Sequence, residues 1–380
     1  MTEEELRDWL TLRAIDGVGA VTLRALVETF GSPRAVRGAS ADALCAGGCS
    51  DALVQAIVAG PNDDVRRTLD REVREIARRK ITILSYLDDR YPALLKAIPD
   101  PPVLLYIMGE WRPDETCTVA IVGSRKSTPQ GRAMTERLSE DLARAGWTVV
   151  SGLARGVDAA AHRGAIAGGG RTLAVLGCGI DRMYPPEHAT LRRQIENNGA
   201  VLSEFALGAP PHSYHFPQRN RIISGLSRGV IVTEATVESG SLITARLAGE
   251  QGREVFAVPG SVREATSRGP HRLIKDGATL VESADDAIQH LLPQLDEATR
   301  ERLRAHGGAQ DASPAPTPVT FTQDERRVLA ALSLEPIEID LVPERCGLPS
   351  AMVSATLLSL ELKGAIRQLP GQRFLRLIEL

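Results

Sequence analysis

The chain has 380 residues, of which 43% are hydrophobic and 24% charged, and its formal net charge is −3. These values are ordinary for globular proteins, exclude collagen-like, fibrous and wholly disordered chains, and with this length predict two or three domains. The apolar runs, such as residues 103–108, are too short to cross a bilayer, and the beginning is acidic where a secretory signal would be basic, so we expect a soluble, cytoplasmic protein without a membrane partner.

Residues 1–80 are predicted to form a small helical domain. Apolar residues recur at helical spacing on both sides of Gly17-Val18-Gly19, a pattern typical of a helix-hairpin-helix or SAM-like domain. The glycines would let backbone N–H groups approach a phosphate at the start of the second helix, but such domains also serve as packing modules, so both roles stay open. A proline-rich connector with a strand or two follows in residues 81–118.

From residue 119 to 283, short apolar runs alternate with helical patterns. This alternation predicts an α/β domain, an extended Rossmann-like parallel sheet with helices on both faces, over residues 81–295. Such sheets bind ligands in the loops at the carboxyl ends of their strands. The expected strands are 119–122, 148–151, 172–176, 200–203, 229–233 and 255–258. The expected helices are 131–145, 157–166, 188–197, 220–226 and 242–251.

The last part of the chain is predicted to be a linker, residues 296–319, and a winged-helix domain, residues 320–380. Thr322 and Glu325 have the spacing of a helix cap, a second helix is expected at 349–363, and a hairpin near Pro370-Gly371 would be the wing. The second helix has one basic residue, so we expect this domain to bind protein or to be structural. The predicted helix at 285–292 would serve a dimer or pack in the core.

Charge is unevenly distributed along the chain. Residues 119–280 carry 20 basic and 14 acidic side chains, net +6, whereas the segments on either side are acidic. A local basic patch can bind a polyanion even when the whole protein is acidic. The central segment is therefore the expected place for nucleic-acid binding.

Four loops that follow predicted strands combine glycine, hydroxyl groups and arginine. Glycine lets the main chain approach a ligand, hydroxyl and N–H groups form anion nests, and the arginine fork matches phosphate. Phe216 beside arginines suits an unstacked base, although Phe216 as core, one arginine in a buried ion pair, and Ser239 as a helix cap stay open. The candidate DNA-binding residues are Gly123, Ser124, Arg125, Lys126, Gly152, Arg155, Gly156, Phe216, Arg219, Asn220, Arg221, Ser239, Gly240, Ser241 and Thr244.

Motifs of several enzyme classes are missing from the sequence. There is no P-loop, and no GxGxxG follows the first strand of the sheet. Asp158 and His162 lie one helical turn apart without a nucleophile elbow nearby, and Asp158 is expected to cap a helix or to pair with an arginine. Five cysteines make neither a disulfide framework nor a zinc site. We expect no catalytic residues, no metal and no cofactor.

Seven short motifs follow one another along the central segment. They are Ala120-Ile-Val-Gly-Ser-Arg125, Ser151-Gly-Leu-Ala-Arg-Gly-Val-Asp158 with Ala161-His162, Gly177-Cys-Gly-Ile-Asp181 with Tyr184-Pro185, Ser203-Glu204, Phe216-Pro-Gln-Arg-Asn-Arg221, Ser239-Gly-Ser-Leu-Ile-Thr244 and Val258-Pro-Gly260. In order and spacing they resemble the DprA/Smf family of DNA-processing proteins.

This resemblance implies an extended Rossmann domain that binds single-stranded DNA without sequence preference, a homodimer, interaction with the RecA recombinase, and a role in natural transformation. It also implies a DNA pocket lined by Gly123, Ser124 and Arg125 together with Phe216, Arg219 and Asn220. Some members place a lysine just before the phenylalanine, where this chain has Ser213, Tyr214 and His215, so one charge is expected to be absent here.

Two other functions are weighed against a non-catalytic recombination mediator. A nucleotide hydrolase on a related Rossmann fold is expected to carry a Pro-Gly-Gly-x-Gly-Thr loop, and this chain has Pro259-Gly260 followed by Ser261. A transcription regulator that uses both terminal domains is disfavoured by the weak basic content of the last one.

Overall fold

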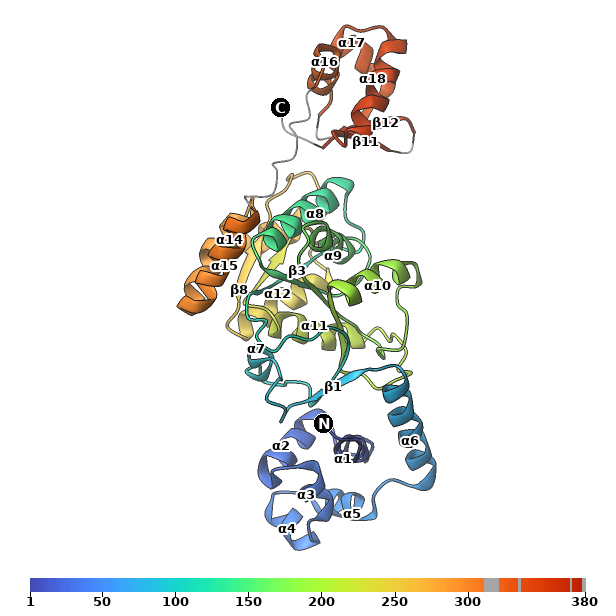
Figure 1. Ribbon diagram of the computed structural model, residues 1–380, viewed down its shortest axis with the longest axis vertical. Helices are drawn as coiled ribbons and strands as arrows, with labels where there is room; N and C mark the ends of the chain where they lie inside the picture. Colours follow the sequence, from blue (N-terminus) through green and yellow to red (C-terminus); the bar gives the residue numbers. More distant parts are fainter. Residues whose placement is uncertain (311–320, 334–335, 370, 378–380) are drawn as a thin grey trace. The chain divides into compact units, whose positions relative to one another are not determined.

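The computed structural model describes residues 1–310, 321–333, 336–369 and 371–377, and it divides into two compact units, residues 1–304 and 305–380 (Figure 1). The predicted boundary near residue 80 lies inside the first unit and stays a prediction. Throughout the ranges just given, each helix is too short or too polar to cross a membrane.

A nine-stranded sheet lies at the centre of the first unit, with the strand order β1-β2-β6-β5-β4-β3-β7-β8-β9. The strands from β3 to β9 run parallel, and β2 is antiparallel to both β1 and β6. All six expected strands are confirmed to within one residue at either end. The strands are β1 (Thr82–Ser85), β2 (Leu104–Gly109), β3 (Thr118–Val122), β4 (Thr148–Ser151), β5 (Thr172–Val175), β6 (Gly199–Ser203), β7 (Gly229–Val232), β8 (Glu254–Ala257) and β9 (Thr279–Leu280).

Helices cover both faces of this sheet, as the apolar strands predict (Figure 1). Along β3, Val119 and Ile121 share one core with α8, α9 and α14, while Ala120 and Val122 share another with α11 and α12. Ala284, Ala287 and Leu291 of α14 are buried in the first of these cores, so core packing accounts for them, and a dimer contact by this helix stays a prediction. The helices are α7 (Ala93–Lys96), α8 (Pro129–Arg144), α9 (Val157–Ala167), α10 (Ala189–Asn198), α11 (His215–Gly225), α12 (Gly240–Glu250), α13 (Arg268–Lys275) and α14 (Ala284–Leu291).

The sheet is doubly wound about β3. The chain adds β4, β5 and β6 on one side of β3 and then returns to place β7 on its other side. The loops after β3 and β7 therefore leave the sheet in different directions, and the crevice between such loops is where open α/β sheets bind ligands.

One predicted loop is wrong. Residues 216–221 were expected before a helix at 220–226, but α11 begins at His215, so these residues form its first turns. Pro217 lies in the first turn, where a helix tolerates proline because the N–H there has no intrahelical partner.

Six helices precede the sheet, as the apolar spacing of residues 1–80 predicts. Side chains of Thr2, Ser32, Ser40, Ser50 and Asn62 cap five of them. These helices share one apolar core with strands β1 and β2. The helices are α1 (Glu3–Arg13), α2 (Ala20–Phe30), α3 (Pro33–Gly38), α4 (Ala41–Ala46), α5 (Asp51–Ala59) and α6 (Asp63–Arg78).

The second unit is a small helical domain with a three-stranded sheet in the order β10-β12-β11. Thr322 and Glu325 form the predicted capping box, and the buried Glu325 carboxylate also binds Lys363 Nζ at 2.7 Å. Helix α15 (Glu297–Gln310) covers the first part of the predicted linker; residues 311–319 and Pro370 of the predicted wing lie outside the described residues. The elements are α16 (Gln323–Ala331), β10 (Ile337–Glu338), α17 (Val342–Cys346), α18 (Ser350–Leu362), β11 (Ile366–Leu369) and β12 (Arg373–Arg376).

Candidate nucleic-acid interface

The loop after β3 presents two exposed cations on a fixed backbone. Ser124 N donates to the carbonyl oxygen of Glu234 at 2.6 Å, and Ser124 O accepts from Val157 N at 3.2 Å. Ser124 Oγ accepts from Lys126 N at 3.1 Å. Gly123 and Ser124 are half-buried, whereas the side chains of Arg125 and Lys126 stand out into solvent.

The backbone of the loop after β4 lies directly against the Arg219 guanidinium at Gly152. A Cβ on Gly152 would overlap the Arg219 guanidinium. The next residue, Leu153, has a φ of 55°, which L side chains rarely adopt, and two histidines hold it there. Leu153 N donates to His162 Nε2 at 3.3 Å, and Leu153 O accepts from His188 Nδ1 at 3.0 Å.

His162 is fully buried, and that burial lowers its pKa to about 3. The imidazole is therefore neutral at ordinary pH, and its Nε2 accepts a hydrogen bond. Nδ1 lies 2.7 Å from Thr172 Oγ1, which fixes the tautomer because Thr172 Oγ1 itself donates to Val149 O. The Asp158–His162 pair has a structural use here: Asp158 accepts from Ala154 N at 3.3 Å, so both side chains brace the same loop.

Phe216 lies at the junction of three loops. Its ring centroid is 5.6 Å from that of Tyr184, and the Arg125 guanidinium carbon lies 4.8 Å from the Phe216 ring centroid. Phe216 is half-buried, and the backbone of Gly177 passes directly against it. The Phe216 ring is therefore partly packed and partly exposed, and the Arg125 guanidinium lies over it.

These groups line one small, shallow hollow at the carboxyl end of the sheet, open to solvent. Of the predicted residues, Arg125, Gly152, Arg155 and Phe216 lie in its wall. Lys126 and Gly156 belong to the same two loops, and Arg155 makes an exposed ion pair with Glu187. The remaining wall comes from Leu153, Ala154, Leu176, Gly177, Cys178, Tyr184 and Pro185. Sequence reasoning had not named the loop after β5 as part of the site, although its Gly177-Cys178-Gly179 and Tyr184-Pro185 motifs were visible.

Two of the predicted arginines point inward. Arg219 is 3% exposed, and its Nε and Nη1 have no hydrogen-bond partner among the residues that the structure describes. Burial lowers the pKa of Arg219 to about 10 and raises the pKa of the neighbouring Asp158 carboxyl. Arg221 is bound by Glu204 at 2.6 Å and by Asp100 at 2.8 Å. The buried ion pair that the sequence left open is thus found at Arg221, whose charge is already balanced.

The fourth predicted loop is largely a helix cap. Ser239 Oγ accepts from Ser241 N at 3.4 Å at the start of α12, and Ser241 and Thr244 are buried. Gly240 is exposed, and its carbonyl oxygen accepts from Asn220 Nδ2 at 3.3 Å. These residues do not line the hollow around Phe216, so the capping alternative accounts for most of this loop.

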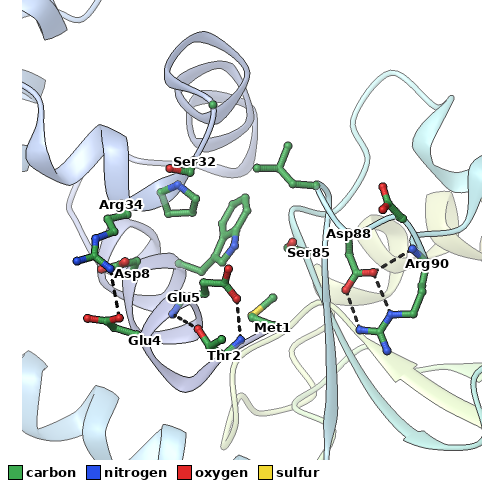
Figure 2. Close-up of a pocket in the computed structure, with 15 residues that line it drawn as sticks. Met1, Thr2, Glu4, Glu5, Asp8, Ser32, Arg34, Ser85, Asp88 and Arg90 are labelled. Carbon is green, nitrogen blue, oxygen red and sulfur yellow. Dashed lines mark hydrogen bonds and ion pairs between the residues drawn. The ribbon is translucent and has the colours of Figure 1, made fainter.

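Size alone does not identify the binding site. A larger cleft, of about 830 Å³, lies where α1 and α3 face the turn after β1 (Figure 2). Five carboxylates and two arginines line it, and its charges pair with one another: Arg34 binds Glu4 at 3.2 Å and Arg90 binds Asp88 at 2.8 Å. A polyanion would be repelled there, so charge favours the smaller hollow.

Possible metal ligands are dispersed in the parts of the chain that the structure describes. No cluster of three His, Cys, Asp or Glu side chains in these parts could hold a metal ion. The five cysteines are free thiols.

Comparison with known proteins points to one family. Residues 82–292 match the family model of DNA recombination-mediator protein A, and residues 310–372 match the DprA winged helix domain. The chain is 42% identical to protein Smf of Escherichia coli over 285 residues, which cover 74% of each chain.

Two solved structures are similar as well. The X-ray structure of DNA processing protein A from Streptococcus pneumoniae has a TM-score of 0.65 and 37% identity, and the match covers 78% of this chain and 99% of that one. DNA processing protein A from Helicobacter pylori, whose structure gave insights into a unique single-stranded DNA binding mode, has a TM-score of 0.52 and 32% identity over 57% of this chain and 98% of that one.

Proposed function

The chain belongs to the DNA recombination-mediator protein A family, and on that premise we propose that it binds single-stranded DNA, without sequence preference, at the hollow around Phe216. The observation that carries this proposal is the exposed Arg125 guanidinium over the Phe216 ring, beside a wall of glycine backbone. A cation and an aromatic plane at one opening suit a phosphate and the base attached to it. The Helicobacter pylori relative, described for its single-stranded DNA binding, supports the same ligand.

The exposed cations would contact the strand and the buried ones would support it. Arg125 and Lys126 stand at the tip of the first loop, where they can reach successive phosphates. Arg219 lies directly behind Gly152, so its charge acts through a thin layer of backbone. Phe216 and Tyr184 offer ring faces, which stack on any base and so favour no sequence.

A binding assay tests this function directly. Fluorescence anisotropy would compare a single-stranded dT oligonucleotide, its duplex with dA, and free dTMP and ATP, each at two salt concentrations. We expect the single strand to bind best and its affinity to fall steeply with salt. Preferential binding of a free nucleotide, or an affinity that ignores salt, would contradict the proposal.

A non-catalytic role is also part of the proposal. Asp158 and His162, the pair that most resembles an acid–base set, brace the loop at Leu153 instead of facing the hollow. We expect purified protein to release neither phosphate nor base from nucleotides. Steady release that a substitution at Arg125 abolishes would favour the hydrolase alternative.

Two partners follow from the family resemblance. A homodimer is supported by an apolar groove between α12 and α13, lined in part by Val237, Ile243 and Leu273, of which Val237 is 51% exposed. We expect Val237→Asp to give monomers in light scattering while Arg125→Ala stays dimeric. A wild-type chain that is monomeric at micromolar concentration would contradict the dimer.

The second partner is the RecA recombinase, which this protein would load onto incoming single strands in the cytoplasm during natural transformation. The test is RecA-dependent strand exchange on DNA coated with a single-strand-binding protein. We expect the wild-type chain to shorten the lag and Arg125→Ala to leave it unchanged. If the wild type and Arg125→Ala shorten the lag equally, RecA loading does not depend on the hollow around Phe216, and this part of the proposal fails.

A further inference from the structure

A carboxylate of the protein itself occupies the start of helix α8. Glu234 follows β7 and is 8% exposed. Its Oε2 accepts from Thr128 N at 2.7 Å, and its Oε1 accepts from Thr128 Oγ1 at 2.7 Å and from Thr266 Oγ1 at 3.2 Å. Thr128 is the N-cap of α8, so the carboxylate lies at the positive end of a 16-residue helix.

The first turn of α8 is shaped around this carboxylate. A Cβ on Gly131 would overlap the Glu234 carboxyl group, so a larger residue there would displace it. The backbone of Glu234 is fixed as well, because its carbonyl oxygen accepts from Ser124 N at 2.6 Å. One residue thus holds both ends of the loop between β3 and α8, the loop that carries Arg125 and Lys126.

This carboxylate lies where doubly wound α/β proteins commonly bind an anion of a ligand. β3 and β7 flank the point where the strand order reverses, and the helix N-terminus at such a point commonly receives a phosphate group of a ligand. The ion pairs found among the described residues include none with Glu234. The dipole of α8, the Thr128 N–H group and the hydroxyls of Thr128 and Thr266 therefore balance the buried Glu234 carboxylate, as they would balance a phosphate.

We propose that Glu234 is an internal substitute for a ligand phosphate. It fixes the loop 123–128 so that Arg125 and Lys126 face outward, and it closes the switch point of the sheet to free nucleotides. The effect on the loop rests on the proposed function, because it concerns DNA affinity. The closing of the switch point does not, because it concerns only which anion occupies the start of α8.

Chemical rescue tests the substitution of one anion by another. Glu234→Ala removes the carboxylate and leaves its donors, so we expect its unfolding midpoint to fall by at least about 3 °C. Sodium acetate or inorganic phosphate at constant ionic strength should restore part of this loss, beyond any shift of the wild type. Glu238→Ala, which removes an exposed carboxylate from the same loop, is the matched control and should respond like the wild type. A variant that loses stability and regains none with either anion would overturn the proposal.

Glu234→Gln tests whether the charge of the side chain matters apart from its size, and it can replace Glu234→Ala if that variant does not fold. The amide keeps the size of the side chain but loses the charge and places an N–H₂ group where one carboxylate oxygen accepted. We expect it to unfold at lower temperature than Glu234→Asp or the wild type. If Glu234→Gln unfolds at the wild-type temperature, charge is irrelevant at this position and the proposal fails.

The DNA and nucleotide arms distinguish this inference from the proposed function. We expect Glu234→Ala to bind the dT oligonucleotide roughly tenfold more weakly, the scale of one lost charge-assisted contact, and acetate to restore the affinity. We also expect ATP or inorganic phosphate to raise its unfolding midpoint but not that of the wild type. A wild-type chain that binds no single strand would contradict the proposed function and leave the anion substitution at α8 standing. Absence of anion stabilisation in Glu234→Ala, with single-strand binding by the wild type intact, would contradict this inference and leave the proposed function standing.

Discussion

The guanidinium carbon of Arg125 lies 4.8 Å from the centroid of the Phe216 ring. One residue comes from the exposed tip of the loop after β3 and the other from the first turn of α11, so the contact joins two elements far apart in the sequence. A cation held over a half-open aromatic ring keeps its charge while its side chain is oriented. The pair is the most specific feature of the hollow.

Removing the Arg125 guanidinium should weaken binding of single-stranded DNA. We expect Arg125→Ala to cost at least about 1.5 kcal/mol, the scale of a hydrogen bond to a charged group, and Arg125→Lys to lie between it and the wild type because lysine lacks the planar fork. Fluorescence anisotropy measures the affinity. Arg137→Ala, which removes an exposed cation from the middle of α8, is the matched control. Equal affinities for Arg125→Ala and the control would exclude Arg125 from the site.

A double-mutant cycle should reveal coupling between Arg125 and Phe216. Phe216→Ala alone should cost about 1–3 kcal/mol in single-strand affinity through lost stacking. The double substitution should cost less than the two single losses together, by roughly 0.5–2 kcal/mol, because each side chain positions the other. Strict additivity would show that the observed contact has no part in binding.

The salt dependence of binding should distinguish outward from inward arginines. Arg125→Ala and Lys126→Ala should each flatten the slope of log affinity against log salt by about 0.7, the value for one phosphate contact on a single strand. Arg221→Ala should leave the slope unchanged, since Glu204 and Asp100 already bind that guanidinium. It should instead lower the free energy of unfolding by up to about 3 kcal/mol by leaving Glu204 without its partner. A flattened slope in Arg221→Ala would place that residue on the DNA.

Acid should destabilise the first unit through His162. The folded pKa of about 3 lies below the ordinary value of 6.5, so between these two values the unfolded chain binds a proton that the folded chain does not. The free energy of unfolding therefore falls as the pH is lowered through this window, by at most about 1.4 kcal/mol per pH unit from this one group. Urea unfolding of His162→Gln between pH 7 and pH 4 should show a smaller loss than the wild type. His290→Gln, at an exposed position, should retain the full wild-type dependence.

The sheet could be predicted from the sequence because its central strands are buried on both faces. Runs such as residues 119–122 and 230–232 are continuously apolar and rich in β-branched residues, which is typical of strands covered on both faces. The start of α11 could not be predicted in the same way. Phe216, Pro217 and the four polar residues that follow have the composition of a loop. Phe216 packs against Tyr184 and Gly177, which come from a different part of the sequence, and such contacts are not visible in the local composition.

The site was predictable in its location but not in the direction of its side chains. Glycine and arginine at the ends of neighbouring strands predicted the edge of the sheet at which Arg125, Gly152 and Phe216 line one hollow, and its use as a binding site stays a proposal. Whether an arginine faces a ligand depends on partners remote in sequence, and Asp100 and Glu204 decide this for Arg221. The same limit applies to Glu234, because its threonine partners at 128 and 266 are brought to it only by the doubly wound topology.

Both edges of the nine-stranded sheet are short. β1, four residues long and mostly buried, closes one edge, and β9, two residues long, closes the other. An ordinary open edge invites another strand to pair with it, which is a common route to aggregation. Two copies of this protein held close together would therefore have little strand edge through which their sheets could pair.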